Sequence, residues 1–389
     1  MTQSKKKETK PKRQNYKSKI TKKKRKTTIV KKKIYSAVSL YAGDKLNPSP
    51  VIGMLTLPVE YGKGMVHSHS YLPQSCVKWI EQCGARVCPI QYDLPRNVTI
   101  GLLEQCNGLV TFGTTLSFFD LDENDKEIPL AIEFRHYKTF IRTLDFIYLY
   151  IASQNMKGNY YPILGLGEGA QMLAMAATFG RERAVSRINK DDLIEQEQQD
   201  NLSRVNAQKM GVPIKFTSRK SWVKKLFTSG ERRRMAKEKI MFTNHLLGFL
   251  VKAPYMKNFT QKTKTSPTIM QIDSVAKGKK GGDYVQMFSF KHLPLFGWEF
   301  LPQIIQFEWR RSFVPHTKLS EMVSRKLAHF FVDQCRRNLN NLVNHKILIY
   351  NYTLYGALHM RKILNPHESN YKYFEKPWEN SYYFNVVKR

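Results

Sequence analysis

The stretch YYPILGLGEGAQMLAMAA, from Tyr160 to Ala177, joins a short apolar run, a glycine-rich turn and a segment rich in Ala, Met and Leu. The apolar run predicts a buried strand, and the last segment has the composition of a helix. Gly165, Gly167 and Gly169 permit a tight connection between the two. A strand that turns directly into a helix is the repeating unit of a parallel sheet covered by helices. An α/β fold is therefore expected.

The same alternation precedes this stretch. Strands are predicted at 51–58, 86–90 and 109–112, and helices at 70–85 and 132–155. Beyond residue 240 the pattern predicts strands at 246–251, 268–272, 284–290 and 304–309, and then an amphipathic helix at 318–338. Together these elements predict a three-layer fold, with a parallel or mixed sheet between helices on both faces.

Positive charge is concentrated at the N-terminus. The chain has 389 residues and a formal net charge of +33, and residues 1–36 contain sixteen Lys or Arg and only one acid, Glu8. Like charges at this density repel one another and prevent independent folding, whereas phosphates neutralise them with release of counterions. We expect this extension to bind RNA, although a nuclear-localisation signal or a solvated tail would have the same composition.

A second basic segment lies at 215–239, where Phe216, Trp222 and Phe227 are interleaved with Lys and Arg. Aromatic rings can stack on bases while cations contact phosphates, so this segment is a candidate RNA surface; a solvated insertion is the alternative. The predicted RNA-binding residues of both segments are Lys5, Lys6, Lys7, Lys22, Lys23, Lys24, Arg25, Lys26, Lys31, Lys32, Lys33, Arg219, Lys220, Lys224, Lys225, Arg232, Arg233 and Arg234.

Several classes of protein and site are disfavoured. No apolar run is long enough to span a bilayer, and no apolar segment typical of a secretory signal begins the chain. His67 and His69 have no third ligand nearby in the sequence, so no metal is expected, and no cofactor motif is present. The five cysteines lack the spacing of a zinc site, which favours buried, reduced thiols: Cys76, Cys83, Cys88, Cys106 and Cys335.

In order and content, six segments resemble gamma-glutamyl hydrolase, a member of the class I glutamine amidotransferase-like superfamily. They are PVIGMLTLP, SYLPQSCVKWIEQCGARVCPI, NGLVTFGTT, GNYYPILGLGEGAQML, LPQIIQFEW and AHFFVDQCRRN, and the resemblance covers about residues 50–355. It implies that family's α/β fold. It also implies a cysteine nucleophile in a G-x-C-x-G elbow, an activating histidine in a Q-W-H-P-E segment and an oxyanion loop F-P-G-G.

The sequence departs from the family at each of these catalytic parts. Gly167 occupies the nucleophile position, and the alignment places Glu308 at the histidine and Arg310 at the following acid. Thr114 replaces a glycine of the oxyanion loop. We therefore expect a pseudoenzyme without catalytic residues or a small-molecule substrate. Glu168, next to the elbow, is interpreted as an acid at the start of a helix.

Three functions remain open. The first is a structural, rRNA-binding component of a large ribonucleoprotein, most simply a mitochondrial ribosome, with rRNA and neighbouring ribosomal proteins as partners. The second is an active gamma-glutamyl hydrolase-like amidase that uses Glu168, Glu308 or a displaced cysteine. The third is a nucleolar RNA-binding module. The expected location of the protein is the mitochondrion, and the nucleolus and the cytosolic ribosome are the alternative locations.

The chain divides into three predicted parts. Residues 1–45 form the basic RNA-binding extension, residues 46–355 the hydrolase-like domain with an insertion at about 183–240, and residues 356–389 an extension rich in aromatic residues. Because so many exposed aromatics would promote aggregation, the last part is expected to dock, and its own domain is the simplest host.

Overall fold

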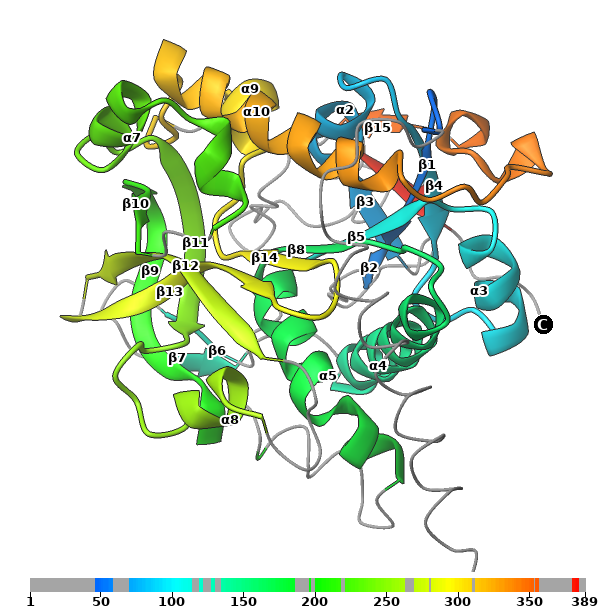
Figure 1. The fold of residues 1–389 in the computed structure, drawn as a ribbon, viewed down its shortest axis with the longest axis horizontal. Helices are drawn as coiled ribbons and strands as arrows, with labels where there is room; N and C mark the ends of the chain where they lie inside the picture. Colours follow the sequence, from blue (N-terminus) through cyan, green and yellow to red (C-terminus); the bar gives the residue numbers. More distant parts are fainter. Residues whose placement is uncertain are drawn as a thin grey trace, which may run out of the picture. The chain divides into compact units, whose positions relative to one another are not determined.

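A mixed sheet of eight strands forms the centre of the computed structural model, in the order β10-β12-β13-β14-β8-β5-β1-β4 (Figure 1). The structure describes residues 46–58, 70–113, 119–121, 127–129, 134–185, 196, 200–217, 221–262, 269–279, 281–309, 312–352, 354–356 and 380–384.

One half of this sheet is parallel. Its strands are β1 (Val51–Leu55), β4 (Arg86–Ile90), β5 (Gly108–Gly113), β8 (Ile163–Gly167) and β14 (Leu295–Trp298). β8 pairs with β5 on one side and β14 on the other, with Leu166 opposite both Phe112 and Trp298. These strands are continuous apolar runs because helices cover both faces of the parallel sheet.

The other half of the sheet is antiparallel. It consists of β10 (Lys215–Phe216), β12 (Met270–Gly278) and β13 (Gly281–Phe290), and β13 pairs with β14. The remaining strands form three smaller antiparallel sheets: β9 (Ser203–Val212) with β11 (Met241–Gly248), β6 (Phe119–Leu121) with β7 (Glu127–Pro129), and β2 (Leu57–Pro58), β3 (Ser70–Pro73), β15 (Leu354–Gly356) and β16 (Asn380–Phe384) in one sheet.

Helices cover the two faces of the central sheet. Helices α4 (Phe134–Met156) and α5 (Glu168–Val185) pack together on one face, and Arg183 pairs with Asp145 at 3.0 Å between them. Helices α2 (Gln74–Glu81), α9 (Ile304–Phe307) and α10 (Lys318–Cys335) lie on the other face (Figure 1). The shorter helices are α3 (Arg96–Leu103), α7 (Ser229–Met235), α8 (Met256–Thr260), η1 (Val223–Leu226), η2 (His345–Ile347) and η3 (Ile349–Asn351).

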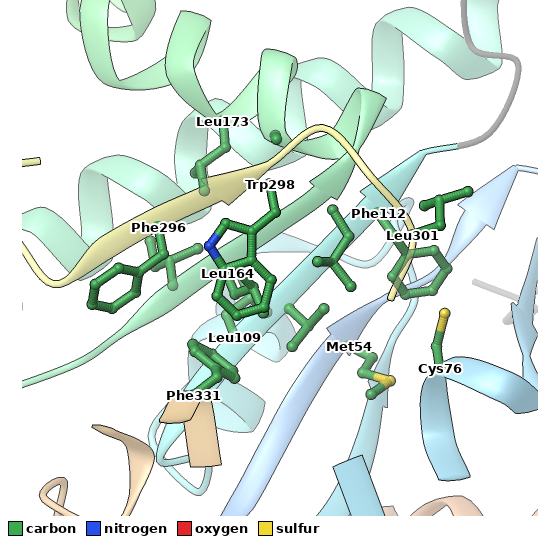
Figure 2. Close-up of a cluster of buried hydrophobic side chains, with 14 of the residues drawn as sticks. Met54, Cys76, Leu109, Phe112, Leu164, Leu173, Phe296, Trp298, Leu301 and Phe331 are labelled. Carbon is green, nitrogen blue, oxygen red and sulfur yellow. The ribbon is translucent and has the colours of Figure 1, made fainter. Parts of the chain in front are cut away.

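The core lies on both sides of the parallel strands (Figure 2). Trp298 of β14 is 1% exposed and meets Trp79 of α2 edge to face, with ring centroids 6.2 Å apart. The Trp79 indole N–H donates to the Ser324 carbonyl at 3.2 Å, which fixes α2 against α10. A large apolar side chain buried in this way contributes about 1.5–3 kcal/mol to the free energy of unfolding.

The expected fold class is confirmed, because helices cover both faces of a mixed sheet in which five adjacent strands, β14, β8, β5, β1 and β4, run parallel. The strand and helix predicted within 160–177 form β8 and α5, and the helix predicted at 318–338 forms α10. Residues 70–73, predicted as the start of a helix, form strand β3 instead, and α2 begins after Pro73.

The strand predicted at 304–309 is wrong. Ile304–Phe307 form helix α9, and the strand lies upstream at Leu295–Trp298. Ile304 and Ile305 are buried, so they satisfy the apolar pattern of a strand while lying in a helical turn. Glu308, which the sequence placed at the histidine position, directly follows this helix instead of lying in a strand.

The C-terminal segment returns to its own domain. β16 pairs with β3 in antiparallel register, with Tyr382 opposite Leu72, and Phe384 is buried against Tyr352 with ring centroids 4.9 Å apart. Docking of the aromatic segment is thereby confirmed for residues 380–384. In the part of the chain that the structure describes, no helix has the length and apolarity needed to cross a membrane.

Candidate functional site

The turn between β8 and α5 is a sharp elbow at the carboxyl end of the parallel strands. Gly167 has a positive φ of 57°, a conformation that costs a residue with a side chain roughly 1–2 kcal/mol. Gly165 and Gly169 permit close packing: a Cβ on Gly169 would lie 2.6 Å from Phe112 Cα, and one on Gly165 would lie 2.6 Å from Ala170 Cα. The elbow thus has the strand-to-helix geometry that presents a nucleophile in hydrolases, but its central residue has no side chain.

Leu301 fills the space above the elbow. A Cβ on Gly167 would lie 2.9 Å from Leu301 Cδ2, and Leu301 is 2% exposed. Figure 2 shows Leu301 beside Phe112, at the ends of the strands. A general base must lie within hydrogen-bond reach of the nucleophile it activates, so the residue in contact with Gly167 occupies the position of the base. That residue is aliphatic and cannot transfer a proton.

This contact corrects the sequence alignment at the histidine. The loop that leaves β14 reads Glu299, Phe300, Leu301, Pro302, Gln303, which matches Q-W-H-P-E at the proline and at the aromatic residue. Leu301 therefore stands at the histidine position and Gln303 at the acid. The assignment of Glu308 and Arg310 to these positions was wrong, because it matched Gln306 and Phe307 to the Gln and the aromatic residue that begin Q-W-H-P-E. The missed signal was Pro302, which directly follows Leu301.

Glu308 lies elsewhere in the interior. It directly follows α9, is 2% exposed, and its carboxylate is close enough to help raise the pKa of the Cys76 thiol. Burial is the larger cause of this raised pKa, so Cys76 is a neutral thiol and a poor nucleophile. Glu168 is the first residue of α5, as expected for an acid at a helix start, and Thr114 lies outside the described residues.

The structure also shows a buried polar cluster next to the elbow that the sequence did not indicate. His245 Nε2 of β11 lies 3.3 Å from Glu299 Oε2, and the two side chains are 1% and 0% exposed. His245 Nδ1 and Thr243 Oγ1 share a hydrogen bond at 2.8 Å, and Gln171 Nε2 donates to Glu299 Oε2 at 3.4 Å. Burial lowers the pKa of His245 to about 3, so His245 is neutral near pH 7, and burial raises the pKa of Glu299 well above its usual value, which favours its protonated form.

Substituting Glu299 by Gln should make the free energy of unfolding less sensitive to pH. Burial raises the pKa of Glu299 on folding, so its contribution to stability falls as pH rises above about 4.5, the usual carboxyl value. Above that pH the stability of Glu299→Gln relative to the unsubstituted protein should therefore rise. Urea unfolding at several pH values measures this difference.

His245→Gln is the control variant for the pH dependence of stability at acidic pH. Because the pKa of His245 falls to about 3 on folding, this histidine costs stability only as pH falls below about 6.5. His245→Gln should therefore gain relative stability towards acid, in the opposite direction to Glu299→Gln. If the curves of stability against pH were parallel for all three proteins, the pKa shifts of Glu299 and His245 would be contradicted.

The second basic segment is folded on the domain. Thr228 caps helix α7 in a capping box with Glu231, and α7 lies beside α10, where Lys326 Nζ contacts Glu231 Oε1 at 2.8 Å. Lys225, Arg233 and Arg234 are exposed. Lys224 and Arg232 are half-buried, and Arg232 donates to the backbone carbonyls of Lys224 and Phe227. The N-terminal lysines and Arg25, together with Arg219 and Lys220, lie outside the described residues.

The aromatic residues of this segment do not form a stacking surface. Phe227 is 2% exposed and packs on Phe216, with centroids 6.2 Å apart. Trp222 is half-buried and meets Phe296 of β14 edge to face. The prediction that these rings stack on bases was wrong, because they anchor η1 and α7 to the core. Their alternation with Lys and Arg reflects an amphipathic segment with one face in the core.

The five cysteines are buried and unbridged, as expected. Among the described residues, no group of three His, Cys, Asp or Glu side chains is arranged to hold a metal ion.

Comparison with known proteins extends the resemblance along the chain. Gamma-glutamyl hydrolase B of Dictyostelium discoideum is 23% identical over 326 residues, 82% of each chain. Gamma-glutamyl hydrolase 1 of Arabidopsis thaliana is 24% identical over 313 residues, and the human gamma-glutamyl hydrolase is 22% identical over 311 residues, or 78% of this chain and 84% of the human one. No protein-family model matches the chain.

Among solved structures, a putative GMP synthase subunit from Thermoplasma acidophilum matches with a TM-score of 0.38 and 14% identity, over 74% of this chain and 94% of that one. The alignments to these sequence relatives span about four fifths of the chain. This protein is thus similar to gamma-glutamyl hydrolases and has a gamma-glutamyl hydrolase-like α/β fold.

Proposed function

We propose that this protein is a catalytically inactive relative of the gamma-glutamyl hydrolases that serves as a structural, RNA-binding component of a ribonucleoprotein particle. The observation that carries the proposal is the contact between Leu301 and Gly167. The two positions where a nucleophile and its base would meet hold an aliphatic side chain and a glycine. Without these groups, an enzyme of this kind retains only the small residual rate that binding and polarisation supply.

The alternative of a carboxylate-based amidase has less support. Glu308 is not at the base position, and Glu168 is 5% exposed at the start of α5. A displaced cysteine is also disfavoured, because the pKa of Cys76 is raised by burial and by the Glu308 carboxylate.

The charge of the chain supports the RNA-binding part of the proposal. Residues 1–36 carry a net charge of +15, and the remaining chain carries +18. A folded body with a long basic extension suits a particle in which rRNA surrounds its proteins. We propose the mitochondrial ribosome as that particle, by analogy with the enzyme-derived subunits of such particles, and a nucleolar particle as the alternative host.

The purified protein should not hydrolyse a gamma-glutamyl peptide substrate above the uncatalysed rate, whereas an active gamma-glutamyl hydrolase assayed in parallel should do so. Glu168→Gln, Glu308→Gln and Cys76→Ser should leave this background unchanged. Turnover that any one of these substitutions abolishes would reject the inactive assignment and identify the residue responsible.

Sedimentation of a cell lysate tests whether the protein belongs to a ribonucleoprotein particle. The protein should migrate with a large ribonucleoprotein, and RNase treatment should shift it to lighter fractions. Migration as free protein before RNase treatment would reject the structural role. Mass spectrometry of the heavy fraction identifies the particle, and separates the mitochondrial from the nucleolar host.

A further inference from the structure

Helices α7 and α10 present exposed cations side by side. Lys225, Arg233 and Lys237 are exposed on η1, on α7 and just after it, and Lys318 and Arg325 are exposed on α10; we call these five residues the α7–α10 basic surface. The salt bridge between Lys326 and Glu231 joins the two helices, which lie together in Figure 1.

The two acids within residues 221–240 are paired with cations. Glu231 contacts Lys326 at 2.8 Å, and Glu238 contacts Arg234 at 2.8 Å. Seven Lys or Arg residues and only these two acids lie within 221–240. On α10, Glu321 lies between Lys318 and Arg325. The five exposed cations outnumber this acid, so the α7–α10 basic surface has excess positive charge, which is complementary to a polyanion.

An exposed aromatic platform lies at the α10 end of this surface. Trp309 is 62% exposed, and its ring stacks on His316 with centroids 4.0 Å apart and planes 8° apart. His316 Nδ1 donates to the Ile305 carbonyl at 2.7 Å, which fixes the ring on which the indole lies. His316 precedes Lys318 by two residues, so the platform adjoins the basic surface.

We propose that Trp309, supported by His316, stacks an unpaired RNA base while the α7–α10 basic surface holds the adjoining phosphates. Lys318 and Arg325 are about 10 Å apart along the axis of α10, and the contact between Lys326 and Glu231 places α7 beside the Arg325 end. Stacking needs only the face of a base and is tolerant of sequence, whereas cations provide the backbone contacts. This inference rests on the proposed function.

Single-stranded RNA fits these features better than duplex RNA does. The bases of an A-form helix are stacked within it, so an aromatic side chain at the protein surface reaches only unpaired or splayed bases. A protein partner would use an exposed tryptophan as an apolar anchor, but charged residues are depleted at the centres of protein interfaces. Here the nearest described ring is that of His316, two residues before the exposed Lys318 that begins α10, so the indole lies close in sequence to a cation rather than within an apolar patch.

The test measures binding of the full-length protein to a labelled oligouridine of about twenty nucleotides and to a duplex RNA of equal length. Trp309→Ala should lower affinity for the single strand by roughly 5- to 100-fold, the range for loss of one base stack. Affinity for the duplex should not change. The dependence of affinity on salt should also be unchanged, because no phosphate contact is removed.

Two variants control this measurement. Trp309→Phe retains an aromatic face and should preserve most of the affinity. Tyr350→Ala removes a ring that is also 62% exposed but lies on η3, outside the basic surface, and should have no effect. If only Trp309→Ala loses affinity for the single strand, the result supports base stacking on Trp309.

Three results would overturn the platform: unchanged single-strand affinity in Trp309→Ala, equal losses for the single strand and the duplex, or an equal loss in Tyr350→Ala. If the unsubstituted protein binds neither RNA, the proposed function itself fails. If it binds both and Trp309→Ala has no effect, only the base-stacking platform is wrong.

Discussion

Replacing the sixteen Lys and Arg residues of positions 1–36 with Gln should lower the affinity for RNA by about 1,000-fold or more near 50 mM salt. Each cation that contacts a phosphate releases about 0.7 of a counterion from a single strand. If half of these cations contact phosphates, the slope of log K against log salt concentration should become shallower by about six. Fluorescence anisotropy over a salt series gives both quantities.

The matched control replaces the fourteen lysines of the same segment with Arg. Charge is then retained while the side-chain chemistry changes, so affinity and salt slope should stay close to those of the unsubstituted protein. Equal losses in the Gln and Arg variants would show that specific lysine contacts, rather than charge, determine binding. A salt slope that the Gln variant leaves unchanged would remove the N-terminal extension from the RNA-binding surface.

The sequence predicted the parallel half of the fold well, for a physical reason. Strands β1, β5 and β8 are buried on both faces, so they form apolar runs bounded by turn residues. The helix at 318–338 was predicted by its apolar face, and Cys335 marks its end in the structure. An apolar pattern that results from burial of a single strand or helix can be recognised in the sequence of that element alone.

The site was harder to predict because short apolar segments are ambiguous. The two buried isoleucines at 304 and 305 suit either a strand or a helical turn. The Gln306–Phe307 pair after them resembles the start of Q-W-H-P-E, and this match moved the base position from Leu301 to Glu308. Only the contact between Leu301 and Gly167 fixes the alignment. Pro302 was the one local signal of the correct register.

Interactions between distant segments left no local signal at all. His245 and Glu299 lie far apart in the sequence, and their approach depends on the packing of β11 beside the loop that follows β14. Similarly, composition could not separate Phe227, which is buried, from Trp309, which is exposed. The sequence identifies residues capable of binding RNA, and the fold decides which of them reach the surface.

Gly169→Ala should destabilise the protein by about 3 kcal/mol or more, a larger loss than a typical surface substitution causes. The added Cβ would lie 2.6 Å from Phe112 Cα and 2.8 Å from Phe112 N and C. These atoms belong to the backbone of β5, which is buried and paired on both sides, so they cannot move as a flexible side chain would. Relief of the clash requires α5 to move away from β5.

Gly101→Ala is the matched control, because it makes the same chemical change in helix α3, where no atom lies within 4 Å of the added Cβ. Alanine is better than glycine inside a helix, so this variant should gain about 0.5–1 kcal/mol. Urea unfolding of both variants therefore gives shifts of opposite sign from one substitution type. If Gly169→Ala is as stable as Gly101→Ala, the elbow does not hold α5 against β5, and the space assigned to Leu301 above Gly167 must be reconsidered. A large loss at Gly169 alone shows that close packing of α5 against β5 maintains this elbow.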